Sequence, residues 1–583
     1  MLREVQAEIE GLLAAYNVKA SEMSIPPKPE MGDLAFPCFT ISKSSGKKPN
    51  EVATDIAGEL NRKLGASSVV LKAQAFGPYV NFFLNSAAIA ELTVRSVQKE
   101  RNLFGDGEAG KGKKVMIEYP SNNTHKEFHI GHFRNVCIGN ALVRLYAREG
   151  YEVYPVNYLN DFGAHVAKCL WGLKKFHADE KAPENKQKWL GEIYAEASMY
   201  LKNNPDAGEE VAAISKQLEA KDKKIWPLFM KTREWSIEKF DEIFAELNVN
   251  HVAVFYEKDI KAKGQKIVDE LLRRGIAKVG EGGAIIVDLS EYKFDIALLR
   301  KSNGVGLYLT ADLPLAEEKF KKFNVDESIV ITGQEQTFYF KQLYKILELM
   351  GEKRKLTHIS YGLVNLPEGK MSSRSGNVIL YEDLRDQVFE KMYEETKARH
   401  SAGRFVIPGQ DRESTPVWLD KKIVDTARKL TQAALKFDMQ KHESGKNIVF
   451  DIREATSVEG FSGPYLLYVV ARINSLTAKA KKEKITVGKN LSCLTSEEEK
   501  RLALMMGESE TVIAKALAQY NPSVIARYCF ELAQAFNDFY SKHSVLNAET
   551  KELAGARLAL SLAVKQVLEN MLAILTIETV EEM

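Results

Sequence analysis

The sequence has few cysteines, and none of them lies close to another. Only five occur among 583 residues, none in a CxxC pair: Cys38, Cys137, Cys169, Cys493 and Cys529. A disulfide-stapled secreted domain or a zinc knuckle needs closely spaced cysteines. We therefore expect buried thiols, with no structural zinc and no other resident metal site.

Long apolar runs and targeting segments are lacking as well. No run of about 18 apolar residues occurs, so the sequence predicts no membrane-spanning segment. The amino-terminal stretch MLREVQAEIEGLLAAY contains Glu4, Glu8 and Glu10, which a secretory signal or an arginine-rich transit peptide avoids. We expect a cytoplasmic protein.

An excess of one charge is also lacking. Lys and Arg number 81 against 79 Asp and Glu, which gives a formal net charge of +2 and no overall sign of nucleic-acid binding. A near-neutral total can still hide a basic face on a long chain, so charge excludes no partner. The 45% hydrophobic and 27% charged residues are typical of a folded, water-soluble protein.

Three regions follow one another along the chain, which is too long for one core. Residues 1–110 combine a leading amphipathic helix with an apolar alternation at 77–84, and end in the loop GDGEAGKGKK. Residues 111–385 mix strand and helix patterns, whereas 386–583 are almost entirely helical in pattern. We predict an α/β multidomain protein: a small α+β amino-terminal domain, a parallel-sheet domain and an all-α carboxy-terminal domain.

The central region opens with a strand, a helix and a second strand. VMIEY (115–119) has the pattern of a buried strand, and 131–150 that of a helix closed by Gly150. YEVYPVNYL (151–159) then supplies a second strand. This βαβ order is typical of a parallel, Rossmann-like sheet.

A charged, helical stretch interrupts the strand pattern of the central region. It covers about 173–263, and we interpret it as a largely helical insertion. Apolar runs return at 283–289, 328–333 and 357–364, separated by helical segments. We expect the parallel sheet to resume with these three strands.

One stretch, SNNTHKEFHIGH (121–132), concentrates reactive side chains directly after the first strand. Its histidines His129 and His132 fall in the first turn of the following helix. A helix amino terminus offers unpaired N–H groups and partial positive charge, so phosphate is the natural ligand. Gly131 between them allows a flat nucleobase to approach the backbone.

Two other interpretations of this stretch stay open at this point. A metal site needs a third ligand, and His125 is the only local candidate, next to Lys126, which repels a cation. A short HIGH string can also arise by chance. A second signature favours phosphate binding: LPEGKMSSRSGNVIL (366–380) is a Gly- and Ser-rich loop that contains Lys370 and Arg374.

The two signatures together resemble the class I aminoacyl-tRNA synthetases, in which a strand followed by HIGH precedes a Lys-Met-Ser loop. Within that class the stretch IEYPSNNTHKEFHIGHFRNVCIGNAL resembles the arginyl-tRNA synthetase family. Further similarity lies in GLYLTADLPLA, GQEQTFYFKQLYKIL, EGFSGPYLLYVVARINS and YCFELAQAFNDFYSKHSVL. The resemblance covers essentially the whole chain.

The resemblance implies a two-step reaction on a Rossmann-like catalytic domain. ATP and L-arginine form arginyl-adenylate, and the arginyl group then moves to the 3′-terminal adenosine of tRNA(Arg). It further implies Mg²⁺ accompanying ATP, an amino-terminal domain touching the tRNA elbow and a carboxy-terminal anticodon-binding domain. We expect a monomer that needs bound tRNA even for the first step.

The arginine pocket must offer acceptors to a planar, permanently charged guanidinium. Tyr308 and Asp312 lie four residues apart at a helix start and so share one face, although a capping aspartate beside a core tyrosine is the alternative. The resemblance assigns the other positions, for which loop hydrogen bonding is the alternative. The expected arginine-binding residues are Glu118, Ser121, Asn123, Tyr308, Asp312 and Gln336.

The expected ATP site combines both signatures. Catalysis of an in-line attack on the α-phosphate is positioning plus neutralisation of charge, so cationic and donor groups are required. The expected ATP-binding residues are His129, Gly131, His132, Lys370, Met371, Ser372 and Arg374. We expect His129, His132, Lys126 and Lys370 to be catalytic.

The second signature lacks one lysine of the usual loop, because Ser373 stands in its place. The resemblance suggests that Lys126 supplies this charge; a solvated surface lysine is the alternative. Asp161 and Gly163 resemble a family segment that lines the same cleft, where His165 replaces the usual glutamine. We expect His165 to be structural.

Contacts to tRNA should combine cations with aromatic stacking on unpaired bases. Tyr79 and Asn81 in GPYVNF are the candidates for a D-loop base, with an ordinary sheet strand as the alternative. Tyr465, Tyr468 and Arg472 are the candidates in the helical region, where core packing competes for the tyrosines.

Three other functions share parts of this pattern. A HIGH-type nucleotidylyltransferase would not need the long helical region that follows. A non-catalytic RNA-binding relative should have lost motif residues, and another class I synthetase remains open because an acidic pocket also suits lysine.

Overall fold

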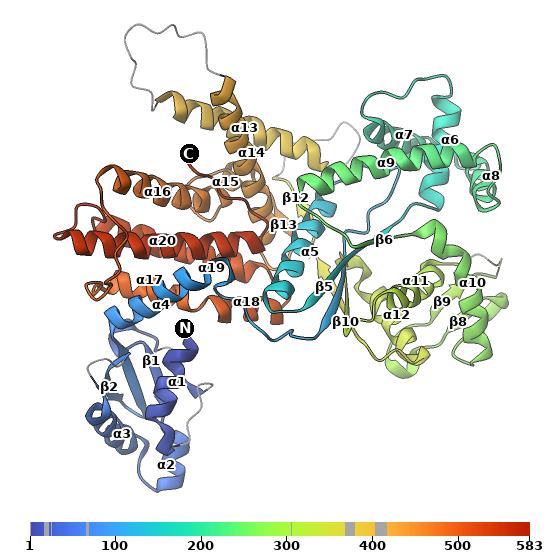
Figure 1. The fold of residues 1–583 in the computed structure, drawn as a ribbon. Coiled ribbons are helices and arrows are strands. Elements are labelled where there is room, and N and C mark those ends of the chain that lie inside the picture. Colours follow the sequence, from blue (N-terminus) through green and yellow to red (C-terminus); the bar gives the residue numbers. More distant parts are fainter. Residues whose placement is uncertain are drawn as a thin grey trace, which may run out of the picture.

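Three regions make up the structure, a computed structural model (Figure 1). The amino-terminal region lies below the helical carboxy-terminal region, and the α/β region lies beside the latter. The structure describes residues 2–16, 22–24, 26–65, 69–302, 304, 306–367, 379–402 and 417–583.

The amino-terminal region is a small antiparallel sheet with helices on it. Its strands have the order β1-β3-β2, with β1 (Leu34–Pro37), β2 (Val70–Phe76) and β3 (Tyr79–Leu84). Its helices are α1 (Leu2–Leu12), α2 (Phe39–Ser45), α3 (Pro49–Lys63) and α4 (Ser86–Glu100). The predicted leading helix and the strand at 77–84 are confirmed.

The central region is built on a parallel sheet of five strands in the order β11-β10-β4-β5-β6. Every neighbouring pair is parallel. These strands are β4 (Lys114–Glu118), β5 (Glu152–Leu159), β6 (Ala253–Tyr256), β10 (Glu327–Gly333) and β11 (Lys355–Tyr361). The chain turns one way from β4 to β5 and the other way to β10, so a switch point lies between β4 and β10.

Helices cover both faces of this sheet, which explains its continuous apolar strands. Val115 and Ile117 of β4 belong to the core cluster of α5 (Ile130–Arg148), whereas Met116 packs in another cluster with Leu315 of α11 (Tyr308–Lys322). Side chains of a strand alternate between faces, so one short run serves both cores. The predicted βαβ unit is confirmed.

The connection from β5 to β6 is helical, as predicted, but the predicted insertion also contains a strand. Residues 253–256 of the expected 173–263 insertion form β6, which extends the parallel sheet beside β5. Its four residues are too short a run to be separated from the charged helices around them. The crossover helices are α6 (Ala164–Phe176), α7 (Lys186–Asn203), α8 (Gly208–Glu219) and α9 (Trp226–Glu246).

The expectation that 283–289 belongs to the parallel sheet is wrong. Here β8 (Ile285–Val287) pairs antiparallel with β7 (Lys278–Val279) and β9 (Ala297–Arg300). An apolar run predicts a strand but not its partner, which contacts far along the chain decide. This outer sheet shares a core with α10 (Glu257–Arg273), α11 and α12 (Thr337–Met350).

The carboxy-terminal region is helical, as predicted. Its helices are α13 (Tyr381–Ala402), α14 (Val417–Gln440), α15 (Ile452–Ala455), α16 (Gly463–Lys482), α17 (Glu497–Gly507), α18 (Ser509–Ala518), α19 (Ser523–Lys542) and α20 (Lys551–Ile574). Among its described residues one short strand occurs, β13 (Ile448–Val449), which pairs with β12 (Val364–Asn365) of the central region. Helix α4 packs on α17 and α20 and joins the amino-terminal region to this one.

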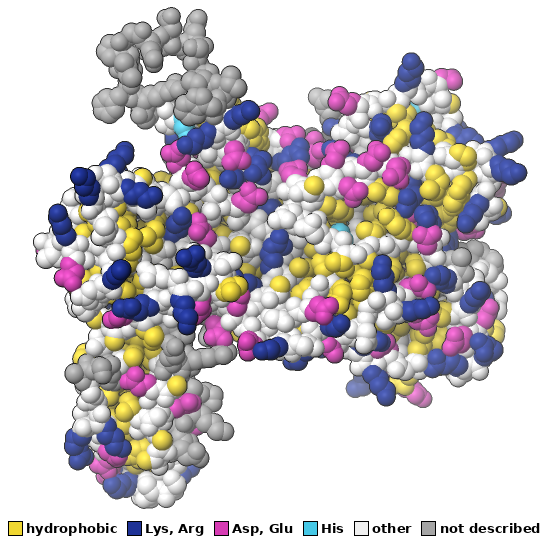
Figure 2. Space-filling view, in the orientation of Figure 1, with side chains coloured by type: hydrophobic (Ala, Val, Ile, Leu, Met, Phe, Trp, Pro, Cys, Tyr) yellow, Lys and Arg dark blue, Asp and Glu magenta, His cyan; other side chains and the backbone are white. Residues whose placement is uncertain are grey.

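The distribution of surface charge and the burial of the cysteines agree with what the composition predicts. In Figure 2, Lys and Arg side chains are intermixed with Asp and Glu over each region of the visible face. Four of the five cysteines are buried, as expected, and Cys493 is half-buried. No described helix is long and apolar enough to cross a membrane.

Candidate active site

A cleft of about 590 Å³ opens at the carboxyl ends of the parallel strands. Its lining includes Glu118 at the end of β4, Tyr158 of β5 and Gly333 of β10. The switch point between β4 and β10 is where ligands bind in open parallel sheets. The topology alone therefore marks this cleft as the candidate site.

The structure brings all six expected arginine-binding residues into this cleft. They come from β4, the segment after it, α11 and the 3₁₀ turn η8 (Gln334–Gln336). The lining contains Glu118, Ser121, Asn123, Tyr308, Asp312 and Gln336. Tyr308 stands at the rim with 78% of its surface exposed, whereas Glu118 is buried.

Four carboxylates line the cleft, and the two assigned to arginine, Glu118 and Asp312, have different partners. The ammonium of Lys319 donates to Glu118 in a buried ion pair, so the charge of that carboxylate is balanced. Asp312 accepts a hydrogen bond from the Tyr339 hydroxyl, and desolvation raises the pKa of its carboxyl to about 6. No Lys or Arg ion pair with Asp312 occurs among the described residues, so its negative charge remains for a cation.

Lys319 is a residue of the site that the sequence analysis missed. It lies seven residues after Asp312 in α11, so both side chains point from one face of the helix. That spacing was a usable signal. Its partner Glu118 lies 201 residues away, however, and no local pattern shows that pairing.

Ser121, which follows the carboxyl end of β4, has a hydroxyl without a hydrogen-bond partner among the described residues. Its backbone N–H donates to Asn157 Oδ1 at 3.2 Å, while its Oγ is buried. The backbone there has φ 57°, which turns the chain sharply after the strand. A buried hydroxyl without a partner is free to bond a ligand.

His129 and His132 form the predicted first turn of α5, stacked at 3.7 Å between ring centroids. His129 Nδ1 accepts from the N–H groups of Gly131 (3.1 Å) and His132 (3.4 Å), and His132 Nδ1 accepts from His129 N–H (3.4 Å). Because both Nδ1 atoms are acceptors, both rings carry their proton on Nε2. Each imidazole can therefore donate one hydrogen bond.

Both imidazoles are neutral at physiological pH. Burial, with a smaller contribution from Lys126, lowers the pKa of His129 to about 4. Burial and the neighbouring His129 place the pKa of His132 well below its ordinary value. Gly131 does not line the cleft. A Cβ at this position would lie 3.0 Å from the His129 ring, so glycine allows the His129 side chain to cap the start of α5.

Lys126 lies outside the cleft lining but within electrostatic reach of it. Its ammonium sits 4.9 Å from the centre of the Tyr194 ring, and Lys168 contacts the same ring at 5.1 Å. The positive charge of Lys126 contributes to lowering the pKa of both histidines. It is half-buried.

His125, the possible third metal ligand, is fully buried away from the other two histidines. Its ring nitrogens bond the hydroxyls of Thr124 (2.9 Å) and Thr232 (2.8 Å). Burial lowers its pKa to about 3, so it is a neutral link to α9. No group of three or more His, Cys, Asp or Glu able to hold a metal ion occurs among the described residues.

Asp161 differs from its expected place in the cleft lining. It is fully buried and accepts from Arg233 Nε at 2.6 Å and from Lys258 N–H at 3.0 Å. It therefore fixes α9 and α10 to the end of β5, and its neighbour Asn160 reaches the cleft instead. His165 bonds the Asn160 carbonyl at 3.1 Å, which suits the structural role expected for it.

The second signature lies mainly outside the described residues, including Lys370, Met371, Ser372 and Arg374. Its carboxyl flank runs beside the first signature. Ile130 N–H donates to the Ile379 carbonyl at 2.9 Å, and Tyr381 N–H donates to the Phe128 carbonyl at 3.1 Å. The described carboxyl flank of the second signature thus lies against the first signature.

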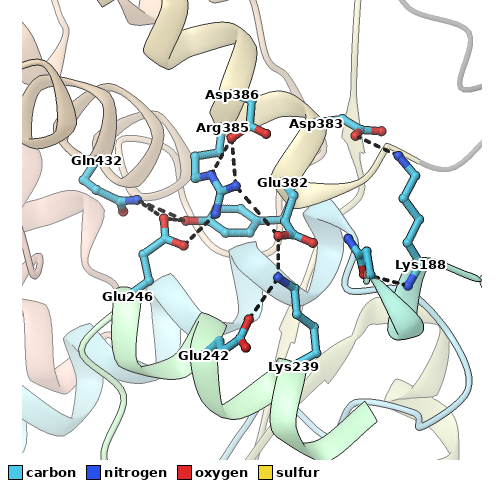
Figure 3. A network of polar contacts seen from close by, with 11 residues as sticks. Lys188, Lys239, Glu242, Glu246, Glu382, Asp383, Arg385, Asp386 and Gln432 are labelled. Carbon is cyan, nitrogen blue, oxygen red and sulfur yellow. Dashed lines mark hydrogen bonds and ion pairs between the residues drawn. The ribbon is translucent and has the colours of Figure 1, made fainter. Parts of the chain in front are cut away.

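A partly buried polar network fixes this flank. Glu246 accepts from the Tyr381 hydroxyl (2.8 Å), Arg385 Nη1 (2.8 Å) and Gln432 Nε2 (2.9 Å). Figure 3 shows Glu246, Arg385 and Gln432 converging from α9, α13 and α14. The Tyr381 ring also stacks on Phe133 of α5 at 4.7 Å. Helices α9 and α14 therefore hold the start of α13 against α5.

The expected tRNA contacts fall into two groups. Tyr465, Tyr468 and Arg472 lie together on α16: Arg472 donates to the Tyr468 hydroxyl at 3.0 Å, and Asn537 of α19 bonds both Arg472 and Tyr465. Tyr79 is exposed at the edge of Phe39.

Asn81 was expected to contact tRNA, but its side chain is buried. It is 1% exposed, and its amide donates to the Met31 carbonyl at 2.7 Å. Consecutive residues of β3 are buried, and the loop containing Met31 covers the Asn81 side chain. The side chain ties strand to loop within its own region.

Family models match nearly the full length. The description "tRNA synthetases class I (R), catalytic domain" matches 93–414, "DALR anticodon binding domain" matches 466–583, and "Arginyl tRNA synthetase N terminal domain" matches 1–84. The catalytic model alone covers more than half of the chain.

Relatives agree along their whole length. An arginine–tRNA ligase of Clostridium perfringens is 34% identical over 96% of both chains, and one of Bdellovibrio bacteriovorus is 33% identical over 96% of this chain and 93% of that one. The arginyl-tRNA synthetase of Thermus thermophilus shares the fold, with a TM-score of 0.78 at 23% identity over 100% of both chains. That of Plasmodium falciparum has a TM-score of 0.72 at 19% identity, over 99% of this chain and 98% of that one. The chain therefore belongs to the arginyl-tRNA synthetases, the class I aminoacyl-tRNA synthetases that act as arginine–tRNA ligases.

Proposed function

We propose that the cleft activates L-arginine with ATP and passes the arginyl group to the 3′-terminal adenosine of tRNA(Arg). One observation carries this proposal: an unpaired carboxylate, Asp312, shares a cleft with two imidazole donors at a helix amino terminus. The carboxylate suits a guanidinium and the helix start suits phosphates. The cleft thus matches both substrates of the first step.

The arginine substrate is placed by its two ends. Asp312 faces the guanidinium, with Tyr308 and Gln336 beside it. Ser121 and Asn123 contact the amino and carboxylate end, which the free Ser121 hydroxyl supports. Glu118 acts there as well, together with its partner Lys319.

ATP lies against the start of α5. The Nε2–H groups of His129 and His132 donate to phosphate oxygens, Gly131 lies under the adenine, and Lys126 adds positive charge. Lys370, Met371, Ser372 and Arg374 complete the site in this proposal, which for them rests on the family resemblance. Mg²⁺ accompanying ATP would supply positive charge that offsets the negative charge of the phosphates.

In the second step the ribose hydroxyl of bound tRNA attacks the adenylate carbonyl, and AMP leaves. Tyr465, Tyr468 and Arg472 contact the tRNA from the helical region, and Tyr79 contacts it from the amino-terminal region. We further propose domain limits at 1–110, 111–385 and 386–583, a monomer, and a cytoplasmic location.

An assay of charging tests this function. The purified chain, incubated with ATP, Mg²⁺, tRNA(Arg) and each amino acid in turn, is expected to charge arginine alone. Exchange of pyrophosphate into ATP should require both arginine and tRNA(Arg). Charging of lysine instead would indicate another class I specificity, and exchange with a small metabolite but no tRNA would indicate a nucleotidylyltransferase.

Arginine binding is expected to weaken at acid pH. The Asp312 carboxyl has a pKa raised to about 6 by desolvation, so in the free cleft it takes up a proton as the pH falls through 6. A neutral carboxyl no longer attracts the guanidinium, and the KM for arginine should rise about tenfold for each pH unit below 6. Exchange kinetics between pH 5 and pH 8 measure this. A KM for arginine that stays constant over that range contradicts it.

A further inference from the structure

A segment of the helical carboxy-terminal region reaches into the catalytic region. Residues 443–450, between α14 and α15, contain β13 and run beside 362–365, the residues after β11. Ile448 N–H donates to the Leu363 carbonyl at 2.9 Å, and Phe450 N–H donates to the Asn365 carbonyl at 2.8 Å. The segment is therefore joined to the catalytic region by backbone hydrogen bonds.

The two segments approach each other most closely at Gly362. Its N–H donates to the Ser444 carbonyl at 3.0 Å. A Cβ at this position would lie 2.4 Å from the carbonyl carbon and oxygen of Lys446, so only glycine fits. This contact is too close for the 443–450 segment to move independently of 362–365.

Arg134 of α5 connects the same two segments to the helix that carries His129 and His132. Its guanidinium is fully buried and donates to the carbonyls of Gly362 at 2.6 Å and Lys446 at 2.8 Å. Burial lowers its pKa to about 10, so it remains charged at neutral pH. The 443–450 segment is thus tied to the ATP side of the cleft.

Asn447 extends this connection to the arginine side. Its Oδ1 accepts from Leu363 N–H at 2.8 Å and from Gln334 Nε2 at 3.3 Å. Gln334 begins the turn η8, which ends at Gln336 in the cleft lining. One amide oxygen of the helical region therefore holds the turn that presents Gln336.

We propose that Asn447 is a positioning residue for the arginine pocket, acting through Gln334 on the turn that carries Gln336. The proposal rests on the proposed function, because Gln336 is assigned to arginine there. The opposite flank of the second signature is fixed differently, by the network around Glu246 in Figure 3. Asn447 is exposed, so its removal leaves the cores intact.

The test is the replacement Asn447→Ala in the full chain, with exchange measured at saturating tRNA(Arg). Loss of these hydrogen bonds is expected to raise the KM for arginine about fivefold. The KM for ATP and the melting temperature should stay unchanged. Asn447→Asp keeps an acceptor oxygen in the same position and should restore the KM for arginine to within about twofold of the original. Asn490→Ala is the matched control, because Asn490 is an exposed asparagine whose bonds stay within the helical region.

The other outcomes overturn the proposal in distinguishable ways. If the unaltered chain charges arginine but Asn447→Ala leaves the KM for arginine unchanged, Asn447 does not position the pocket. If Asn447→Ala raises both KM values equally, or if Asn447→Asp restores nothing, the residue has only a general structural role. If the unaltered chain charges no arginine, the proposed function and this inference both fail.

Discussion

Asp312→Asn is expected to raise the KM for arginine by about a hundredfold or more. Asparagine has the same shape and can still accept from the Tyr339 hydroxyl, so the change removes charge without opening a cavity. Removing one member of a desolvated ion pair costs about 3–5 kcal/mol, and each 1.4 kcal/mol is a factor of about ten. Pyrophosphate exchange with an arginine titration at saturating tRNA(Arg) measures this effect.

Three comparisons make the Asp312 result specific. Glu317→Gln removes a carboxylate from the exposed side of the same helix and should leave the KM for arginine unchanged. Tyr339→Phe removes only the hydrogen bond to Asp312 and should cost about fivefold. The KM for ATP should not change in the Asp312 variant. An arginine KM within about threefold of the original would assign the guanidinium to another residue.

The local part of the site could be predicted from the sequence. An apolar strand, a polar segment and an amphipathic helix follow one another from Lys114 of β4 to Arg148 of α5. Ligands of parallel sheets bind at the carboxyl ends of the strands. Tyr308 and Asp312 share a helix face for the same geometrical reason. These features depend on neighbours in the chain, which the sequence shows directly.

The remaining features depend on partners far along the chain. Lys319 pairs with Glu118 across 201 residues, and Arg134 contacts Lys446 across 312 residues. The apolar run around 285–287 predicts a strand but not the sheet to which the strand belongs. The alternation around Asn81 likewise does not show that a distant loop covers this side chain. Residue type and spacing predict that a segment forms a strand or an exposed face. They do not predict which distant segment packs against it, because that contact forms only when the chain folds.

The charge balance of the cleft has a consequence for ATP. Both imidazoles are neutral, so they donate hydrogen bonds without adding positive charge. Lys319 is the only Lys or Arg among the described lining residues, and it is paired with Glu118. Charge building up on the phosphates must therefore be neutralised by cations outside this lining. Of the cations assigned to the site, Lys126 is the one outside the lining that belongs to the described residues.

Lys126→Ala is accordingly expected to lower the rate of adenylate formation by about a hundredfold, the size of losing one electrostatic contact to a transition state. Its charge already acts on His129 and His132, as their lowered pKa values show, so phosphates bound at those rings lie within its field. Single-turnover formation of arginyl-adenylate with saturating ATP, arginine and tRNA(Arg) measures the chemical step. The KM for arginine should change little, because the lysine lies outside the pocket lining.

Lys168→Ala is the matched control, because Lys168 places its ammonium over the same Tyr194 ring at nearly the same distance. It belongs to α6, is half-buried like Lys126 and has no assigned role in ATP binding, so its removal should change the rate less than about threefold. Lys126→Arg keeps the charge and should retain most of the rate. Equal losses in the Lys126 and Lys168 variants would point to the Tyr194 packing instead. An unchanged rate in Lys126→Ala would contradict this role. The negative charge on the phosphates would then be neutralised by residues of the second signature alone.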